Sequence, residues 1–409
     1  MIYSAALTTE TDEALVAHLE RADRQEDLCF ALWRPSQGSD RLSALVDAPI
    51  LPRPGERNVH GNASFEPQYF ERALGLALEH DAGLALLHAH PGGRAWQEMS
   101  ADDLAAEHGH AAQAQAASGL PLLGLTLATG DGGWSARLWE KTAPRTYTRR
   151  DCECVRVVGG QLVVTYDDRQ RPRPRFRPEL ERTLSAWGET VQAHLARLRI
   201  GVIGAGSVGA LVAEALARMG VERIRLIDFD SVEAVNRDRL LHSSARDVRL
   251  GRAKVESLAR GLRRSATAAM PRIEPHELSV VEPAGFGAAL DCDVLFSCVD
   301  RPWPRYVLNV IAYAHLIPVV DGGIAIERTS RATLRGADWK AHVAAPQRRC
   351  LECLGQYDPG LVQTERDGFF DDRITSSACP TTTRSSATRT CSPSPLAAPA
   401  WRSGSSSRW

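Results

Sequence analysis

The sequence predicts an α/β protein with two units: an α+β unit over residues 1–150, and a Rossmann-like unit over residues 179–372 whose sheet is mainly parallel. Three observations predict this class. A chain of 409 residues is longer than one ordinary domain. From residue 199 onward, short apolar runs alternate with helical periods, as in a parallel sheet covered by helices. A glycine-rich turn at residues 204–209 directly follows the first of these runs.

Residues 1–150 mix strand-like and helical patterns, which is typical of an α+β unit. A helical start precedes an apolar run at residues 28–33, and a region rich in Gly and Pro follows as far as Gly61. The elements expected after it are a helix at residues 66–80, a strand at 84–87, a helix at 101–117, and strands at 120–129 and 134–140.

Residues 151–178 are expected to link the units, because residues 169–178 are rich in Arg and Pro and successive prolines interrupt helices and strands. The second unit is expected to begin with a helix at residues 179–196. Its strands are expected at residues 199–203, 223–227, 294–298 and 317–320, with helices at 208–219, 254–263 and 305–314.

Residues 373–409 differ from the rest of the chain, because they contain no acidic residue and are dominated by Ser, Thr, Pro and Arg. Such a composition does not build a packed core. Two interpretations stay open: a disordered low-complexity tail, or a slipped reading frame, since residues 389–395 admit codons whose neighbouring frame encodes Glu-Asn-Val-Phe-Ala-Phe-Ser.

The charge balance and the start of the chain exclude some classes of protein. The 49 basic and 50 acidic residues give a net charge of −1, which argues against a general nucleic-acid or membrane-surface binder. No apolar run reaches the roughly 18 residues that cross a bilayer, and the start of the chain lacks the features of a signal peptide. We therefore expect a cytoplasmic protein whose nine cysteines are thiols, metal ligands or catalytic groups rather than disulfides.

A candidate metal site follows the strand at residues 84–87. His88 and His90 lie two residues apart, so both imidazoles project to one face and reach the same metal ion. Asp103, in the first turn of the next expected helix, adds a carboxylate ligand. Three protein ligands with an open fourth position are typical of a catalytic zinc site, in which bound water becomes acidic.

Two more residues complete a hydrolytic site in this interpretation. Ser100 is the candidate hydrogen-bond donor to the oxyanion. Glu26, just before the apolar run, is the candidate general base, and Asp27 is the alternative base. Structural alternatives stay open for all of them. The histidines also fit an ordinary loop, Ser100 and Asp103 an N-cap with a first-turn acid, and Glu26 a solvated strand-edge charge.

The combined pattern of His-X-His-Pro, Ser-X-X-Asp and an upstream Glu resembles the JAB/JAMM metalloprotease family over about residues 1–150. The roles that the resemblance implies are Zn²⁺ ligands for His88, His90 and Asp103, water activation for Glu26, and oxyanion binding for Ser100. The spacing from His90 to Asp103 is slightly longer than in the compact form of the motif. Members of this family typically cleave peptide or isopeptide bonds after the C-terminal glycine of ubiquitin-like proteins.

The glycine-rich turn is a candidate nucleotide site, because it follows an expected strand and opens an expected helix. Gly204 suits the tight turn, Gly206 the close approach of a phosphate, and Gly209 the packing of helix on strand. Asp228, at the end of the next expected strand, fits a hydrogen bond to a ribose hydroxyl. A nicotinamide dehydrogenase would show these same residues, so they leave the ligand open.

The residues that follow resemble the ThiF/MoeB/HesA adenylyltransferase family, whose larger relatives are the ubiquitin-activating enzymes. The resemblance covers about residues 180–355 and rests on Asp228-X-Asp230, Asn236-X-X-Arg239, Gly251-X-X-Lys254, Cys298-Val299-Asp300 and the helix that begins near Arg182. Thr183 departs from this pattern, since the family usually has Gln there.

The resemblance implies a site for ATP and Mg²⁺, in which cations surround the phosphates and a carboxylate holds the metal. The implied roles are nucleotide contacts by Gly204, Gly206, Gly209, Asp228 and Asp230, phosphate contacts by Asn236, Arg239 and Lys254, magnesium binding by Asp300, and catalysis by Arg239 and Arg182. Arg182 would act as an arginine finger in the partner subunit's site, which implies a homodimer.

Cys350 and Cys353 have the spacing of half a structural zinc site. A second pair with this spacing is absent downstream, where Cys379 and Cys391 lie in the unusual tail. Three interpretations stay open: zinc ligands, a thiol at Cys353 that accepts the activated carboxyl as a thioester, or inert cysteines.

Together these observations predict a protein that adenylates the C-terminal glycine of a ubiquitin-like protein and also processes that modifier with a zinc-dependent peptidase. A conjugating enzyme is a possible further partner. The first alternative is the processing and activation of a sulfur-carrier protein for cofactor or siderophore biosynthesis. The second alternative is a degenerate, non-catalytic scaffold that binds a ubiquitin-like tail. A dehydrogenase is the alternative that the residues favour least.

Overall fold

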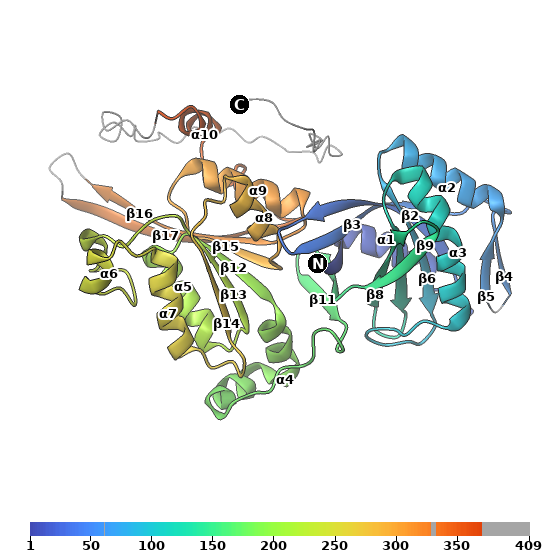
Figure 1. The fold of residues 1–409 in the computed structure, drawn as a ribbon, viewed down its shortest axis with the longest axis horizontal. Coiled ribbons are helices and arrows are strands. Elements are labelled where there is room, and N and C mark those ends of the chain that lie inside the picture. The colour runs from blue at the N-terminus through green and yellow to red at the C-terminus, as the bar shows by residue number, and fades with distance from the viewer. Residues whose placement is uncertain (61, 329–332, 370–409) are drawn as a thin grey trace.

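The computed structural model describes residues 1–60, 62–328 and 333–369, and its two large sheets divide the chain into two units (Figure 1). The elements of the first unit are β1 (Ile2–Thr8), α1 (Thr9–Leu19), β2 (Leu28–Gln37), β3 (Arg41–Ile50), β4 (Arg57–His60), β5 (Asn62–Phe65), α2 (Pro67–Glu79), β6 (Gly83–His90), α3 (Ala101–Ser118), β7 (Leu122–Ala128), β8 (Gly133–Ala143), β9 (Thr146–Asp151), β10 (Cys154–Val158) and β11 (Leu162–Tyr166). Nine of these strands form one mixed sheet in the order β11-β10-β1-β3-β2-β6-β7-β8-β9.

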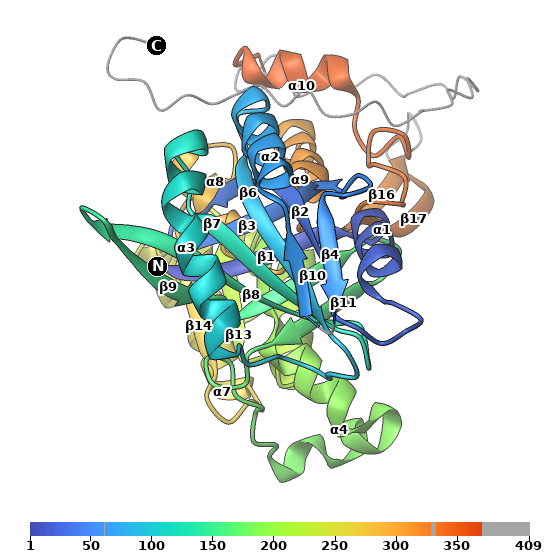
Figure 2. The ribbon, with the colours of Figure 1, turned by 90° about the vertical axis from the view of Figure 1, so that its right-hand side faces the viewer.

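Helices cover both faces of the first sheet, because its strands are apolar on both sides. Leu15 and Leu19 of α1 pack into a core on one face, which also contains Trp33 of β2. On the other face, α2 and α3 lie side by side (Figure 2), and Tyr69 and Ala111 of these helices pack against Phe30 and other strand residues. The sheet therefore forms the middle of a three-layer unit.

The first unit differs from the sequence prediction in three places. The chain begins with β1 rather than a helix, and the expected turn region contains β3. Residues 154–166, within the segment 151–178 that was expected as a linker, form the hairpin of β10 and β11 before the chain leaves the unit. The β-branched residues of Cys154–Val158 and Leu162–Tyr166, separated by Gly159 and Gly160, favour such a hairpin.

The second unit has a six-stranded sheet in the order β14-β13-β12-β15-β16-β17, in which only β17 is antiparallel to its neighbour. Its elements are a 3₁₀ turn η1 (Pro178–Leu180), α4 (Glu181–Arg197), β12 (Arg199–Ile203), α5 (Ser207–Arg218), β13 (Arg223–Ile227), a 3₁₀ turn η2 (Ala234–Asn236), α6 (Ala245–Arg249), α7 (Lys254–Ser265), β14 (Arg272–His276), α8 (Pro283–Leu290), β15 (Val294–Ser297), α9 (Pro302–Ala314), β16 (Val319–Arg328), β17 (Leu334–Ala344) and α10 (Pro359–Arg366).

The strand order confirms the Rossmann-like prediction for the second unit. The chain runs outward from β12 to β14 and then returns to place β15 on the other side of β12. Residues of α5 and α7 form a core on one face of the sheet, and residues of α8 and α9 form a core on the other. In such sheets a crevice opens at the carboxyl ends of the strands where the order reverses, which here is between β12 and β15.

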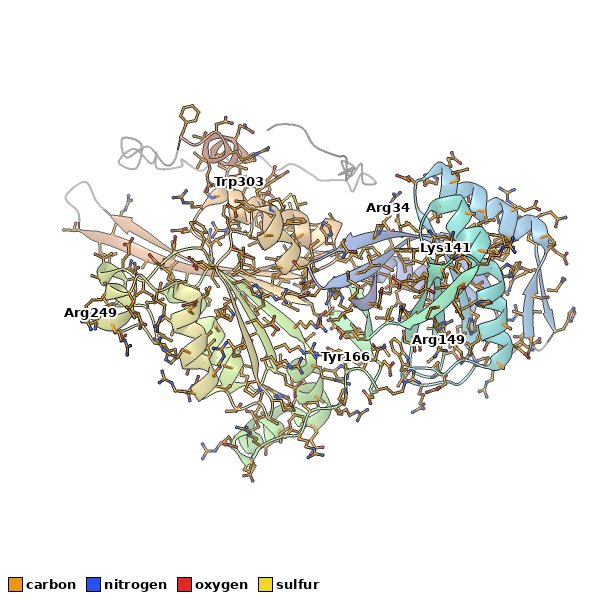
Figure 3. The ribbon with its side chains drawn as sticks, in the orientation of Figure 1. Arg34, Lys141, Arg149, Tyr166, Arg249 and Trp303 are labelled. Atoms are coloured by element: carbon orange, nitrogen blue, oxygen red, sulfur yellow. The ribbon has the colours of Figure 1, made fainter. Side chains whose placement is uncertain are left out.

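A buried polar junction joins the two units. The Arg41 side chain, at the start of β3, is fully buried and donates to Asp293 Oδ1 at 2.6 Å and to the Cys292 carbonyl at 3.0 Å. Arg199 donates to Glu153 Oε2 at 2.7 Å across the same junction, where side chains fill the space around Tyr166 (Figure 3). Although burial opposes it, the Arg41 guanidinium keeps the pKa of Asp293 well below its usual range.

Because residues 291–293 precede β15 and Arg199 begins β12, the junction contacts the amino edge of the parallel sheet. The carboxyl edge of that sheet is left to the loops that follow its strands. None of the helices in the described part of the chain is both long enough and apolar enough to cross a membrane.

Candidate functional site

The end of β6 brings two histidines together. His88 and His90 alternate correctly on the strand to share one face, and their Nε2 atoms lie 3.2 Å apart. The strand is held on both sides, antiparallel to β2 and parallel to β7. Two imidazole nitrogens are therefore fixed at a separation that allows both to bind one metal ion.

The start of α3 adds a carboxylate to this pair. Asp103 Oδ2 lies 3.9 Å from His88 Nε2 and 3.6 Å from His90 Nε2. Within the described ranges, these three residues are the only group of three or more His, Cys, Asp or Glu side chains arranged to hold a metal ion, with ligand atoms all within 4.8 Å of one another. We call His88, His90 and Asp103 the metal cluster below.

The charges of the metal cluster fit a cation. The nearby His90 ring keeps the pKa of Asp103 well below its usual range, so this carboxylate is ionised. Burial, together with the charge of Arg137, lowers the pKa of His88 to about 4. His88 is therefore neutral at pH 7, which is the protonation state that binds a metal ion.

Glu26 and Asp27, the two candidate bases, have different surroundings in the loop before β2. Burial and the charge of Asp103 raise the pKa of Glu26, while His90 opposes the rise, so Glu26 is electrostatically coupled to the metal cluster. Asp27 is fully buried and instead accepts hydrogen bonds from the Leu28 amide at 2.8 Å and from Arg21 at 3.2 Å. The structure thus gives Asp27 a structural role.

Ser100 caps α3 and is bonded to a residue of the metal cluster. Its hydroxyl donates to Asp103 Oδ2 at 2.7 Å, and its oxygen accepts from the Asp103 amide at 3.1 Å. The N-cap alternative is therefore correct as a description of the local structure. The same cap also orients the Asp103 carboxylate toward the two histidines.

A buried ion pair behind the metal cluster was not predicted from the sequence. Arg137 of β8 pairs with Glu107 of α3, and it also donates to Thr126 Oγ1 at 2.8 Å. Thr126 Oγ1 lies 3.4 Å from His88 Nε2. Since Glu107 follows Asp103 by one helical turn, this pair also fixes the face of α3 that carries Asp103. The only signal in the sequence is a charged residue in the middle of the mainly apolar residues 134–139.

A small cleft adjoins the loop between His90 and Ser100. Its lining includes Trp96, Gln97, Met99, Ser135, Arg149 and Arg169. Arg149, labelled in Figure 3, comes from β9 at the edge of the sheet. Asp151 and Glu98 also line the cleft and are paired with Arg149 and Arg169, so the lining carries both charges.

The glycine-rich turn after β12 is shaped by close contacts. Gly204 has a φ of 92°, and a Cβ there would lie 2.6 Å from the Cys298 carbonyl oxygen. A Cβ at Gly209 would lie 1.8 Å from the Gly204 carbonyl oxygen. By contrast, a Cβ at Gly206 would meet no atom within 4 Å, so the backbone at the start of α5 faces open space. Such an open helix start is suited to an anion.

Asp228, Asp230 and Lys254 form a connected group beside this turn. Asp228 follows β13 and accepts hydrogen bonds from the amides of Ala205 at 2.6 Å and Asp230 at 2.7 Å. Burial raises the pKa of Asp228, against the effect of these hydrogen bonds. Lys254 Nζ donates to Asp230 Oδ2 at 2.6 Å. The only candidate phosphate-binding lysine is thus paired with a carboxylate in the structure.

The remaining candidate nucleotide residues lie in the segments that follow β13 and β15. Asn236 Oδ1 accepts from the Glu233 amide at 3.2 Å, and Arg239 donates to the Val235 carbonyl at 2.8 Å. Asp300 is exposed in the loop after β15. Gly204 and Asp300 therefore follow β12 and β15, the two strands that flank the point where the strand order reverses.

The structure does not bring Arg182 to this site. Arg182 is exposed near the start of α4, and the end of α4 leads into the amino end of β12 (Figure 1). The glycine-rich turn follows the carboxyl end of that strand. Gly188, with a φ of 83°, kinks α4. Arg182 therefore lies on an element away from the glycine-rich turn of its own chain, which is compatible with a role in a partner subunit's site.

Cys350 and Cys353 lie together in a turn, where the Cys353 amide donates to Cys350 Sγ at 3.3 Å. In the part of the chain that the structure covers, no third His, Cys, Asp or Glu joins them in a metal-binding group. Cys379 and Cys391, and the predictions for residues 373–409, lie outside the described residues.

Comparison with known proteins identifies the family of the second unit. Residues 180–389, just over half of the chain, match the sequence profile of the ThiF family. The chain belongs to the ThiF family. The match begins at residue 180, so it concerns the unit that carries the glycine-rich turn, which we call the ThiF unit.

Curated relatives resemble the chain only over part of their own length. Molybdopterin-synthase adenylyltransferase of Escherichia coli is 32% identical over 163 residues, which are 38% of this chain and 59% of that protein. Ubiquitin-like modifier-activating enzyme 5 of Drosophila willistoni is 29% identical over 31% of this chain and 33% of its own length. The tRNA threonylcarbamoyladenosine dehydratase of E. coli is 27% identical over 45% of this chain and 68% of its own length.

Solved structures also match part of the chain. The crystal structure of E. coli MccB with AMPCPP and MccA has 21% identity and a TM-score of 0.38, covering 50% of this chain and 57% of that chain. The E. coli tRNA N6-threonylcarbamoyladenosine dehydratase TcdA has 26% identity and a TM-score of 0.33, covering 40% and 68%.

Proposed function

We propose that the ThiF unit uses ATP and Mg²⁺ to adenylate the C-terminal glycine of a ubiquitin-like or sulfur-carrier protein. The observation that carries this proposal is the glycine-rich turn at the crevice between β12 and β15, where Gly206 leaves the helix start open. Membership of the ThiF family supports it, as do the names of relatives that adenylate or activate such proteins.

In this proposal each candidate residue has one role. Asp228 and Asp230 contact the nucleoside, Asn236, Arg239 and Lys254 contact the phosphates, and Asp300 holds Mg²⁺, which would neutralise phosphate charge when bound. Lys254 has to exchange its contact with Asp230 for a phosphate oxygen. Arg182 acts in the site of a partner subunit, so the active form is a homodimer, and Cys353 is a candidate thioester acceptor.

The proposed reaction forms one bond and breaks one. A carboxylate oxygen of the terminal glycine attacks the α-phosphorus of ATP, and the bond from that phosphorus to the bridging oxygen of the β-phosphate breaks. The products are an acyl adenylate and pyrophosphate, so no proton transfer is needed in this step. The cations around the phosphates stabilise the charge that develops on the leaving pyrophosphate.

ATP–pyrophosphate exchange by the full chain tests this proposal, with and without carrier proteins that end in glycine. We expect exchange only with a carrier, and its loss in Asp300→Ala. Asp338→Ala is the matched control, because Asp338 is exposed on β17. Exchange that is unaffected by Asp300→Ala would refute the site, and exchange driven by a carboxylate on tRNA instead of a carrier would refute the substrate. A thiocarboxylate product after sulfur addition would identify a sulfur carrier.

We further propose that the first unit is a zinc-dependent peptidase or isopeptidase acting on the same carrier. The metal cluster supports this, because its three ligand atoms already converge. Zinc bound there would supply an acidified water and polarise the scissile carbonyl. Glu26 would accept a proton from the water and return it to the leaving amine. Ser100 would give up its bond to Asp103 to contact the oxyanion.

Cleavage of a carrier protein with a peptide extension after its terminal glycine tests the second activity. We expect cleavage that requires zinc and is lost in His88→Ala, while the ATP-dependent exchange stays intact. Cleavage that persists in His88→Ala would refute the metal site. A chain that binds neither zinc nor ATP, yet captures a carrier tail, would support the scaffold alternative instead.

A further inference from the structure

We propose that Gln97 is a positioning residue that holds His90 in its metal-binding orientation, and that Gly93 provides the space for it. This inference rests on the proposed zinc site in the first unit. Gln97 lies in the loop between β6 and α3, outside every motif that the sequence analysis singled out. Its side-chain oxygen Oε1 lies 3.3 Å from His90 Nδ1.

The orientation of the Gln97 amide is determined by its other hydrogen bonds. Its Nε2 group donates to the Arg94 carbonyl at 2.7 Å and to the Ala95 carbonyl at 3.3 Å. Because carbonyl oxygens only accept, the nitrogen of the amide faces them and the oxygen faces His90. The Gln97 oxygen can only accept as well, so His90 Nδ1 carries a proton.

This proton decides which nitrogen of His90 is available to a metal ion. With Nδ1 protonated, the neutral ring has its lone pair on Nε2. Nε2 is the atom that lies 3.2 Å from His88 Nε2 and 3.6 Å from Asp103 Oδ2. Gln97 therefore favours the tautomer that the metal cluster needs, as outer partners of metal-bound histidines commonly do.

The position of Gln97 is itself fixed by the surrounding structure. Its backbone amide donates to Ser135 Oγ at 2.6 Å, and Ser135 is buried in β8. A Cβ at Gly93 would lie 2.4 Å from Gln97 Oε1. Alanine at position 93 would therefore displace the Gln97 side chain without changing its chemistry, which provides a second and independent way to remove the contact.

Zinc affinity, measured by competition with a chelator on the full chain, tests the inference. We expect Gln97→Leu and Gly93→Ala each to weaken zinc binding about 10- to 100-fold. Gln97→Glu should weaken binding less than Gln97→Leu, because its carboxylate still accepts from Nδ1 although it loses the two donations of Nε2. Gln113→Leu is the matched control, since Gln113 is exposed on α3. Unchanged affinity in both Gln97→Leu and Gly93→Ala would overturn the inference.

A second measurement does not depend on zinc. In metal-free protein labelled with ¹⁵N at histidine, we expect the His90 signals of the neutral ring to report a proton on Nδ1, and Gln97→Leu to shift the population toward the other tautomer. A natural chain that binds no zinc but shows this change would refute the proposed metal site while supporting the role of Gln97. An unchanged tautomer in Gln97→Leu would overturn that role.

Discussion

The metal cluster and the glycine-rich site differ in how complete they are without a ligand. In the first unit, His88, His90 and Asp103 already place their ligand atoms within 4.8 Å of one another. In the ThiF unit, Lys254 is paired with Asp230, and Arg239 is bonded to a backbone carbonyl. On the proposed functions, the first site needs only its ion, whereas the second has to exchange side-chain partners for a nucleotide.

The difference follows from the elements that carry the residues. The metal cluster lies on a central strand and on the capped first turn of a helix, and both are fixed by backbone hydrogen bonds. Arg239 and Asp300 are exposed on loops and Asn236 ends the 3₁₀ turn η2. The side chains of Asn236 and Arg239 bond to neighbouring backbone groups, which a ligand would have to replace. The proposal for the ThiF unit is thus supported by family membership, whereas the proposal for the first unit is supported by the geometry of the metal cluster.

Removing one member of the metal cluster should have the largest effect on ligand binding. We expect His88→Ala to weaken zinc binding by more than about 100-fold. Loss of a residue that only hydrogen-bonds to a metal ligand costs up to about 100-fold, and His88 is itself a proposed ligand. His80→Ala is the control, because His80 is exposed at the end of α2. Equal zinc affinity in the two variants, measured by chelator competition, would show that the convergence of the cluster is incidental.

A change at Lys254 tests the site that has to rearrange. We expect Lys254→Met to lower carrier-dependent ATP–pyrophosphate exchange about 100-fold, because a cation at the phosphates is lost. Lys254→Arg should retain part of the rate, although a planar guanidinium is not equivalent to a point charge. If Lys254→Met keeps the full exchange rate, Lys254 does not contact the phosphates, and its role is limited to the ion pair with Asp230.

Substitutions at Gly206 and Gly209, at the start of α5, distinguish an effect on ATP binding from an effect on stability. We expect Gly209→Ala to lower the free energy of unfolding by about 1–3 kcal/mol, because its Cβ would collide with the Gly204 carbonyl. Gly206→Ala should cost less than about 1 kcal/mol, yet weaken ATP binding, since its Cβ enters the open space. Chemical denaturation and calorimetric ATP titration measure the two effects. The same loss of stability in both variants would contradict this assignment.

The effect least connected with ligand binding concerns the junction between the two regions. Burial lowers the pKa of His315 to about 4, and its Nδ1 lies 2.8 Å from Ser36 Oγ of the first unit. Since the unfolded chain takes up this proton near pH 6.5, stability should fall by about 2–3 kcal/mol between pH 7 and pH 4. His315→Gln should remove that part of the pH dependence in urea denaturation. An identical pH dependence in both proteins would show that the ring titrates normally.

The sequence predicted the second unit better than the first, for physical reasons. The strands at residues 199–203 and 223–227 lie where expected, because buried parallel strands are continuous apolar runs between helices. Strands β10 and β11 were missed, since a hairpin of short strands beside an Arg- and Pro-rich stretch has a weak pattern.

Among the candidate site residues, too, only the contacts that follow from local patterns were predictable from the sequence. His88, His90 and Asp103 were predicted to converge because strand alternation and a helix cap fix their directions. The contact between Gln97 and His90 was not predictable, since it depends on loop geometry and on the space at Gly93. Nor was the ion pair of Arg137 with Glu107, which joins β8 to α3 across the fold.

The junction at the amino edge of the second sheet keeps the two candidate sites apart. Leu28 of β2 pairs with His88, whereas the turn at the other end of β2 contacts Asp291. The ten residues of β2 span roughly 30 Å, and β12 with β15 separates the junction from the nucleotide loops. If both activities operate, a carrier released at one site has to diffuse through solvent to reach the other. The presence of both units in one chain would then ensure equal amounts of the two catalysts. Between the two steps, the free carrier could be bound by competing proteins.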